Sequence, residues 1–290
     1  MAVNPKLHRQ LLQFQRNEIT EHHIYRKLSR VVRDSANRAV LSRISEEELE
    51  HYHVWKKYTG EDVKPDKLKV WFYYWAARLL GLCFSVKLME RGEETAQETY
   101  GGLTTEVSEM NDIAEDENAH EESLVGMIDE ERLRYTGSIV LGLNDALVEL
   151  TGALAGLTLA LQNARLIALT GSITGIAAAF SMAASEYLST KSEDTEKEPV
   201  KASVYTGLAY IVTVVILITP YLILSNYYVS LGIALAAAIM IIFAFNYYVS
   251  VAKVLPFRKR FLEMAGLSLG IAAFSFGIGF ILRVLFGVEA

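Results

Sequence analysis

The spacing of apolar and polar residues changes character near residue 136 of the 290-residue chain. Before that point, apolar residues recur at helical spacing with charged residues between them, and after it long segments are almost continuously apolar. The first pattern predicts amphipathic helices, and runs of about twenty apolar residues predict helices that cross a ~30 Å hydrocarbon layer. We therefore expect an all-α protein with a polar N-terminal half and a membrane-embedded C-terminal half.

Four amphipathic helices are expected in the first half. Asp34 or Ser35 can cap the start of the second helix, and Gly60 suits the position just after its end. Residues 59–69 are polar and contain Pro65. Fully extended, this segment reaches about 36 Å, which is enough to run the length of a helix bundle. The four helices are expected at about 6–31, 37–58, 70–100 and 104–131.

Five membrane spans are expected in the second half, at about 138–161, 166–188, 203–224, 228–250 and 263–286. Cytoplasmic loops are rich in Lys and Arg. Such residues gather between the fourth and fifth spans and before the first span, whereas the opposite side shows only Arg165 and Arg283. No apolar segment typical of a signal peptide follows Met1. We therefore expect a cytosolic N-terminus and a C-terminus outside.

The first two spans carry acidic residues at bilayer depth. Asp145 and Glu149 share one face of the first span because they are four residues apart, and Met182 and Glu186 have the same spacing in the second. A carboxylate there costs at least ~2.5–3.5 kcal/mol and usually faces a bundle interior or a water-filled path. Carboxylate and thioether groups together favour a first-row divalent metal. The alternative is that neighbouring polar side chains satisfy Asp145 and that Met182 is core packing.

A second group of candidate metal ligands lies on the amphipathic helices. The second and fourth helices each carry Glu-x-x-His, and the first and third supply further acids. This is the di-iron carboxylate arrangement of a four-helix bundle. Glu50-x-x-His53 is a competing match, and His8, His22 and His23 are interpreted as surface residues. The expected ligands are Glu18, Glu48, His51, Glu90, Glu93, Glu117 and His120, with the choice among Glu90, Glu93 and Glu94 left open.

Charge and cysteine content exclude several classes of function. The net charge of −6 lies mainly in the first half, which argues against nucleic-acid binding and is compatible with cation binding. The single cysteine, Cys83, excludes a disulfide framework and a CxxC metal site. We interpret Trp55, Trp71 and Trp75 as core or membrane-facing residues rather than redox relays.

These motifs resemble two known families joined in one chain. NEITEHHIY, EELEHYH, MERGEE and EDENAH are similar to the rubrerythrin/ferritin-like di-iron superfamily. GLNDALVEL and SMAASEYLSTKSE are similar to the first two spans of the vacuolar iron transporter family. The fusion resembles the membrane-bound ferritin type of iron exporter. The resemblance implies a cytosolic ferritin-like four-helix bundle over residues 1–134 and a five-span transporter-like domain over residues 135–290.

The resemblance also implies roles for individual residues. It makes the seven expected bundle ligands di-iron ligands, Asp145 the translocation acid and Met182 a metal-binding methionine. Glu186 matches an acid of the family, whereas Glu149 stands where eukaryotic members carry an apolar residue or proline. Between the second and third spans, residues 191–201 replace a long metal-binding insertion, which assigns cytosolic metal capture to the bundle. Rubredoxin-type cysteines are lacking, so an in-chain electron donor is missing.

Two functions of different classes follow from these features. The first is a transporter that exports Fe²⁺, with Mn²⁺ as a second candidate, by proton antiport along a path lined by Asp145, Glu149, Met182 and Glu186. The second is a membrane-anchored di-iron ferroxidase or peroxide-scavenging enzyme. A bundle that senses iron and gates the transporter is not separated from iron delivery by the sequence. We expect a homodimer in a prokaryotic plasma membrane.

Overall fold

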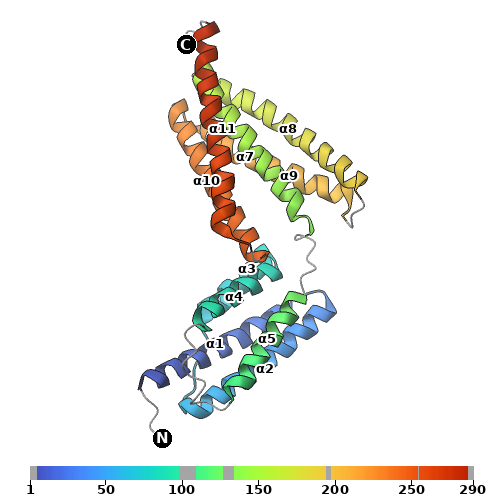
Figure 1. Ribbon diagram of the computed structural model, residues 1–290, viewed down its shortest axis with the longest axis vertical. Coiled ribbons are helices and arrows are strands. Elements are labelled where there is room, and N and C mark those ends of the chain that lie inside the picture. Colours follow the sequence, from blue (N-terminus) through green and yellow to red (C-terminus); the bar gives the residue numbers. More distant parts are fainter. Residues whose placement is uncertain (1–4, 98–108, 127–133, 194–196, 254, 287–290) are drawn as a thin grey trace. The chain divides into compact units, whose positions relative to one another are not determined.

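The computed structural model describes residues 5–97, 109–126, 134–193, 197–253 and 255–286. All ten elements in these residues are α-helices, which confirms the predicted all-α class (Figure 1). The chain divides into two compact units, residues 1–130 and 131–290, called here the N-terminal unit and the C-terminal unit. Each unit contains five of the described helices.

Helices α1 (Pro5–Ser29) and α2 (Ser35–Thr59) are joined by a short connection and pack against each other in the N-terminal unit. The Asp34 side chain accepts a hydrogen bond from the backbone N–H of Asn37 at the start of α2. Gly60 follows the helix with a φ of 70° and donates its N–H to a carbonyl of the last turn. The predicted start and end signals of this helix are therefore confirmed.

The third predicted helix is wrong as a single element, because the helix is interrupted at Gly81. Gly81 has φ 105° and ψ 155°, a conformation that residues with a side chain rarely adopt. It separates α3 (Lys67–Leu80) from α4 (Leu82–Gln97). Helix α3 also begins before the predicted Val70, because the Asp66 carboxylate accepts hydrogen bonds from two backbone N–H groups of the first turn.

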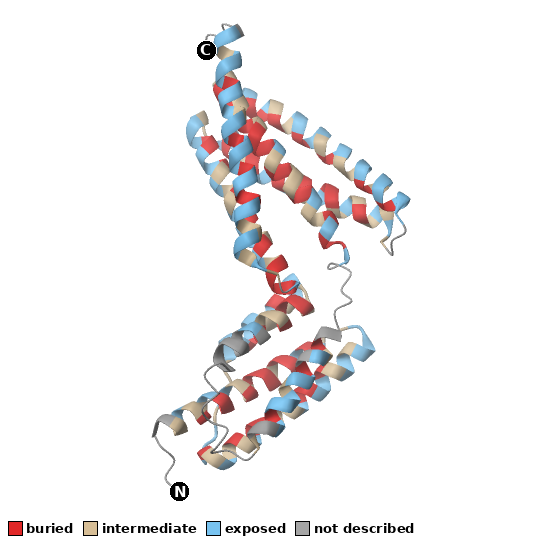
Figure 2. Cartoon of the chain, viewed as in Figure 1, coloured by how far each residue is buried: buried red, intermediate tan, exposed pale blue. Residues whose placement is uncertain are grey.

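Two apolar clusters enclose a polar layer inside the N-terminal unit, and Figure 2 shows its buried residues. On α1, Leu11 and Phe14 belong to the first cluster, the buried Glu18 follows, and Ile24 and Leu28 belong to the second. Helix α2 and helix α5 (Met110–Gly126) pass through the same three layers. The first cluster contains Leu11, Phe14, Trp55 and Ile113, and the second contains Ile24, Tyr25, Leu28, Leu41, Ile44, Val70, Val86, Met89 and Leu124.

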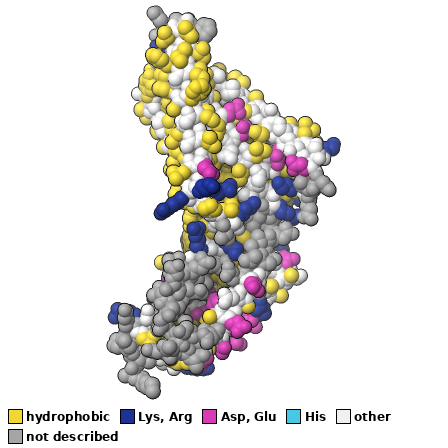
Figure 3. All heavy atoms as spheres, viewed as in Figure 1, with side chains coloured by type: hydrophobic (Ala, Val, Ile, Leu, Met, Phe, Trp, Pro, Cys, Tyr) yellow, Lys and Arg dark blue, Asp and Glu magenta, His cyan; other side chains and the backbone are white. Residues whose placement is uncertain are grey.

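The C-terminal unit contains five helices that are long and apolar enough to cross a membrane. The expected number of long apolar helices is thus confirmed, and these helices indicate an integral membrane protein. Hydrophobic side chains cover much of the face of this unit that Figure 3 shows. Helix α7 packs against each of the other four. The helices are α7 (Thr136–Leu161), α8 (Ala164–Ser192), α9 (Pro199–Ile223), α10 (Tyr227–Ala252) and α11 (Phe257–Phe286).

Glycines bring α7 and its neighbours into close contact. A Cβ atom on Gly142 of α7 would lie 2.3 Å from the carbonyl oxygen of Thr206 in α9. A Cβ atom on Gly279 of α11 would lie 2.3 Å from the carbonyl oxygen of Gly156 in α7. Small residues allow such approach between membrane helices. These contacts join helices of one chain.

We predict that Gly142→Ala destabilises the C-terminal unit, because the new methyl group would overlap a backbone oxygen that cannot move freely. Overpacking of this kind costs about 1–3 kcal/mol. The measurement is the midpoint of thermal unfolding of the detergent-solubilised chain. Gly266→Ala is the control, since nothing lies within 4 Å of its Cβ position. Equal midpoints for the two variants would contradict the tight α7–α9 contact.

Candidate metal centre and membrane cavities

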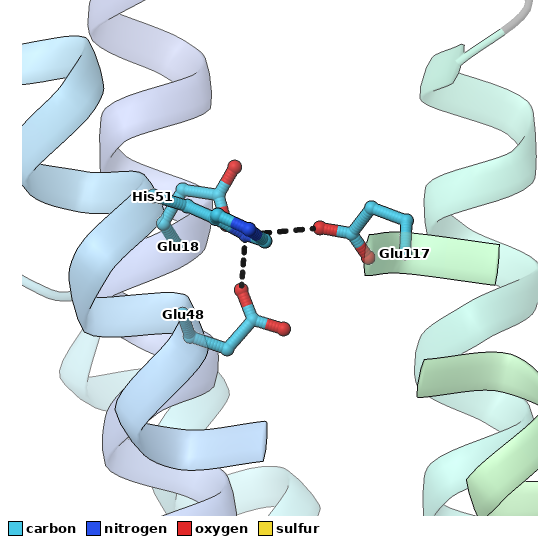
Figure 4. A group of neighbouring side chains, drawn as sticks. All are labelled: Glu18, Glu48, His51 and Glu117. Carbon is cyan, nitrogen blue, oxygen red and sulfur yellow. Dashed lines mark ion pairs between the residues drawn. The ribbon is translucent and has the colours of Figure 1, made fainter. Parts of the chain in front are cut away.

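Four buried or half-buried ligand groups from three helices converge in the polar layer of the N-terminal unit. Glu18 comes from α1, Glu48 and His51 come from α2, and Glu117 comes from α5. Figure 4 shows these side chains pointing toward one another. Each offers one ligand atom, and these atoms all lie within 4.8 Å of one another. The i, i+3 spacing on α2 aims a carboxylate and an imidazole at the same point.

The distances within this cluster leave space for an ion. The Nδ1 atom of His51 lies 3.7 Å from Glu18 Oε2, 3.8 Å from Glu48 Oε2 and 3.6 Å from Glu117 Oε1. These separations exceed those of ordinary hydrogen bonds. Nδ1 of His51, Oε2 of Glu18 and Oε2 of Glu48 are buried without a hydrogen-bond partner. Buried polar atoms are normally satisfied, so the cluster fits a bound metal ion.

His120, the fifth expected bundle ligand that the structure places, borders the same cluster. Its Nδ1 atom lies 3.3 Å from Glu48 Oε1 and 3.9 Å from Glu117 Oε2, and it too is buried without a hydrogen-bond partner. The His51 and His120 rings lie 5.9 Å apart between centroids. The geometry therefore adds His120 as a further ligand beside the four converging groups.

Two carboxylates outside the cluster orient the histidines. Nε2 of His51 lies 3.2 Å from Asp116 Oδ2, and Nε2 of His120 lies 2.8 Å from Glu47 Oε2. Each carboxylate accepts a hydrogen bond from an N–H group at Nε2, which leaves Nδ1 of each ring for the metal. Arg43 in turn donates to both oxygens of Glu47 at 2.9 and 3.0 Å. Sequence reasoning missed Glu47 and Asp116, although each directly precedes the Glu of a Glu-x-x-His motif.

Burial and mutual repulsion raise the pKa values of the clustered carboxyl groups. Burial raises the pKa of Glu18 well above its usual range. Burial, followed by the charge of Glu117, raises the pKa of Glu48 to about 8. Burial lowers the pKa of His51, but the interactions of its ring with the carboxylates of Glu117, Glu18 and Glu48 outweigh burial, and the net shift is upward. Near neutral pH the metal-free cluster therefore holds protons that a metal would displace.

The other candidate ligands predicted from the sequence do not join the cluster among the described side chains. Glu90 and Glu93 belong to α4, but their side chains, like that of Glu94, lie outside the described residues. Glu50 and His53 are exposed, so the competing motif faces away from the cluster.

The interpretation of His22 as a surface residue is wrong. His22 is buried between α1 and α2, where its Nδ1 atom lies 2.5 Å from the carbonyl oxygen of Ser45. It follows Glu18 by one helical turn and so shares the face of α1 that packs on α2. Trp55, interpreted as packing, is buried and also donates its indole N–H to Glu18 Oε1 at 2.9 Å.

In the C-terminal unit, Asp145 and Glu149 line two different cavities. The half-buried Asp145 lines a cavity of about 480 Å³ between α7, α10 and α11. Glu149 lines a cavity of about 400 Å³ between α7, α8, α9 and α11, where the Tyr210 hydroxyl donates to Glu149 Oε2 at 2.9 Å. Ser268 lies in sequence between the α11 residues that line the first cavity and those that line the second, and it donates to the carbonyl oxygen of Leu147 at 3.0 Å.

Met182 and Glu186 line neither of these two cavities. Glu186 is buried and accepts a hydrogen bond of 2.5 Å from the Ser138 hydroxyl, which joins α8 to the start of α7. Met182 is half-buried against the apolar core of the unit. Within this one chain, the structure thus does not bring the four expected path residues together.

The cavity at Asp145 also contains potential metal ligands that sequence reasoning missed. Asn246 of α10 is buried, and its Nδ2 atom lies 2.8 Å from the carbonyl oxygen of Ile242 and 3.1 Å from the thioether sulfur of Met264. Glu263 of α11 lines the same cavity. The lone amide in the apolar segment around Asn246 was a signal that could have identified this residue. Carboxylate, amide and thioether groups together suit a first-row divalent metal.

Comparison with known proteins identifies part of the C-terminal unit. Residues 136–198, which contain α7 and α8, match the model of the VIT family. This match, together with the five apolar helices, indicates a membrane transporter of metal ions. No curated protein and no solved structure matches the chain.

We predict that Glu47→Gln weakens metal binding by the cluster about 10–100-fold, because groups that orient a ligand contribute this much to metal affinity. The measurement is the Kd for Mn²⁺ or Fe²⁺ of the full chain in detergent. Glu50→Gln is the matched control, since Glu50 lies on the same helix and is exposed. A similar loss in both variants would show a general charge effect rather than orientation of His120.

We also predict that metal binding releases protons at neutral pH. Glu48 has a pKa of about 8, and the ligands must lose their protons to bind. Affinity should therefore rise as the pH is raised through about 8. Calorimetry in buffers of different ionisation enthalpy measures the proton count, which should fall in Glu48→Gln. A binding enthalpy that does not depend on the buffer would contradict the raised pKa values.

Proposed function

We propose that the chain exports Fe²⁺ from the cytosol, with Mn²⁺ as a second candidate substrate. The observation that carries this proposal is Asp145, a half-buried acid in a membrane-spanning helix that lines a cavity with amide and thioether groups. An ionisable residue within a membrane span marks an ion path by default. Asp145 also lies in the segment that matches the VIT family.

The order of the two cavities supports a path along α7. The first is lined by α7 residues between Val140 and Val148, and the second by α7 residues between Glu149 and Ala160. Helical rise makes residues 140–160 about 30 Å long, which matches the hydrocarbon thickness. Between the cavities, the Ser268 hydroxyl contacts Leu147 and lies 3.2 Å from the Thr151 hydroxyl. This α7–α11 contact is the constriction that transport would have to open.

Proton antiport follows from the same two acids. A membrane-embedded carboxyl group can hold either a proton or a cation, so exchange at Asp145 or Glu149 would couple the two fluxes. Lys and Arg residues of the α10–α11 connection favour a cytosolic position for this end of the spans and for the N-terminal unit. We extend the proposal to a homodimer in a prokaryotic plasma membrane.

The N-terminal unit is proposed to be a ferritin-like domain that collects metal for the transporter. The buried cluster offers three carboxylates and His51, and His120 borders it. Glu90 and Glu93 of α4 are proposed to complete the ligand set. Iron bound there would supply redox chemistry with dioxygen or peroxide, and this chain would contribute the ligands, their orientation and their burial. Met182 and Glu186 are proposed path residues on the family resemblance alone.

The second candidate is a membrane-anchored ferroxidase or peroxide-scavenging enzyme. It is favoured by the burial of the cluster, whose unpaired ligand atoms are better placed for a retained metal than for rapid transit. A sensing role, in which metal at the cluster gates the transporter, uses the same residues.

We predict that Asp145→Asn lowers Fe²⁺ flux into proteoliposomes at least about tenfold, equivalent to ~1.4 kcal/mol of lost binding at the path. Flux is measured with a metal-sensitive dye inside vesicles under an imposed pH gradient. Glu198→Gln is the control, because Glu198 is exposed and its carboxylate forms an ion pair with Lys201 at 3.0 Å, outside both cavities.

A parallel assay of Fe²⁺-dependent oxygen consumption distinguishes the two candidates. The transporter proposal requires flux that is lost in Asp145→Asn and kept, at saturating metal, in Glu48→Gln. If the unaltered chain moves no metal but consumes oxygen in a manner that Glu48→Gln abolishes, the enzyme is the correct function and the spans are an anchor.

A further inference from the structure

Helix α3 of the N-terminal unit turns large apolar side chains to the outside. The residues recur at spacings of three and four, so at about 100° per residue they occupy one side of the helix, an arc of about 100°. An isolated exposed apolar residue is ordinary, but a contiguous aromatic face marks an interaction surface. The exposed fractions are 80% for Leu68, 61% for Trp71, 51% for Phe72 and 44% for Trp75.

The opposite side of α3 already serves the interior of the unit. Val70 is buried in the second apolar cluster, and Tyr73, Tyr74 and Ala77 pack against that cluster. One side of α3 therefore packs against the unit, and the other side is apolar and exposed. A helix that only covered a core would carry charged residues on its outer side.

Cations flank this apolar face. Helix α3 contains Lys67, Lys69 and Arg78, all exposed, and no acidic residue, in a chain with a net charge of −6. Helical geometry places Lys69 on one border of the apolar face and Lys67 and Arg78 on the other. Aromatic residues bordered by Lys and Arg are typical of helices that lie in the headgroup region of a membrane.

The chain itself keeps the N-terminal unit near a bilayer. Only residues 127–135 separate the end of α5 from the start of α7, the first membrane span. Nine residues extend to at most about 30 Å. The N-terminal unit therefore cannot leave the neighbourhood of the membrane, and even a weak affinity of α3 for lipid would keep it bound.

We propose that α3 lies on the membrane surface, with Trp71, Phe72 and Trp75 among the lipid headgroups and its cations against anionic lipid. A second copy of the chain fits this face less well. Symmetric pairing through α3 would bring two sets of three cations together without an acid on either helix. Anionic headgroups supply the opposite charge that these residues lack within α3.

The three tryptophans of the chain make this proposal testable by fluorescence. The full chain is reconstituted in vesicles of phosphatidylcholine and phosphatidylglycerol, with or without bromine on the acyl carbons nearest the headgroups. Bromine quenches tryptophan only at short range. We expect quenching of the unaltered chain and its near-complete loss in Trp71→Phe/Trp75→Phe, where only the buried Trp55 remains.

Single variants identify which tryptophan enters the lipid and guard against misfolding of the double variant. Lys67→Gln/Lys69→Gln should reduce the quenching in anionic vesicles and leave it unchanged in neutral ones. Two results would overturn the proposal. In the first, aqueous acrylamide quenches Trp71 and Trp75 and bromolipid does not, which places α3 in water. In the second, neither agent quenches them and cysteines introduced at Leu68 cross-link two copies, which makes the face a dimer interface.

Discussion

Like-charged carboxylates held together inside a protein repel one another, and the interior of the N-terminal unit is arranged around that repulsion. Glu18, Glu48 and Glu117 approach one point from three helices, and protons or a metal must compensate their charge. The apolar clusters on either side keep water away from this layer and so raise the pKa values. The same burial that makes the metal-free cluster unfavourable makes it selective for a multivalent cation.

The candidate path acids of the C-terminal unit are spaced apart, in contrast to the clustered carboxylates of the N-terminal unit. The three candidate path acids do not converge on one point: Glu149 accepts a hydrogen bond from the Tyr210 hydroxyl, Glu186 accepts one from the Ser138 hydroxyl, and Asp145 lines a separate cavity. Isolated groups of this kind bind a cation more weakly than a converging set does. A dense cluster suits retention of a cation and spaced acids suit its passage, which is the division of roles that the proposed function assigns to the two units.

The features that depend on local sequence were predictable. Helix periodicity, the Asp34 and Gly60 helix ends and the five apolar segments follow from short-range preferences, and the structure agrees with them. The i, i+3 motifs on α2 and α5 correctly indicated which side chains converge, because that spacing fixes direction on a helix. Gly81 was missed because its positive φ depends on the packing of α3 and α4 rather than on a breaking pair such as Gly101-Gly102.

Features that depend on contacts between distant segments could not be read from spacing. Glu47 is hydrogen-bonded to His120, which lies 73 positions away in the sequence, and Ser268 is hydrogen-bonded to Leu147, which lies 121 positions away. Asp145 and Glu149 share a helical face, yet the helices packed around α7 divide that face between two cavities. Local pattern identified the candidate residues, and tertiary packing decided their partners.

The short connection between α5 and α7 also affects how the proposed metal cluster would exchange ions with the membrane helices. Nine residues join α5 to α7, and a tether this short gives an effective concentration on the order of millimolar. Under the delivery role proposed above, transfer to the membrane helices would depend on this tether rather than on free metal in the surrounding solution. Release of each ion would also require protons to return to the ligands of the cluster.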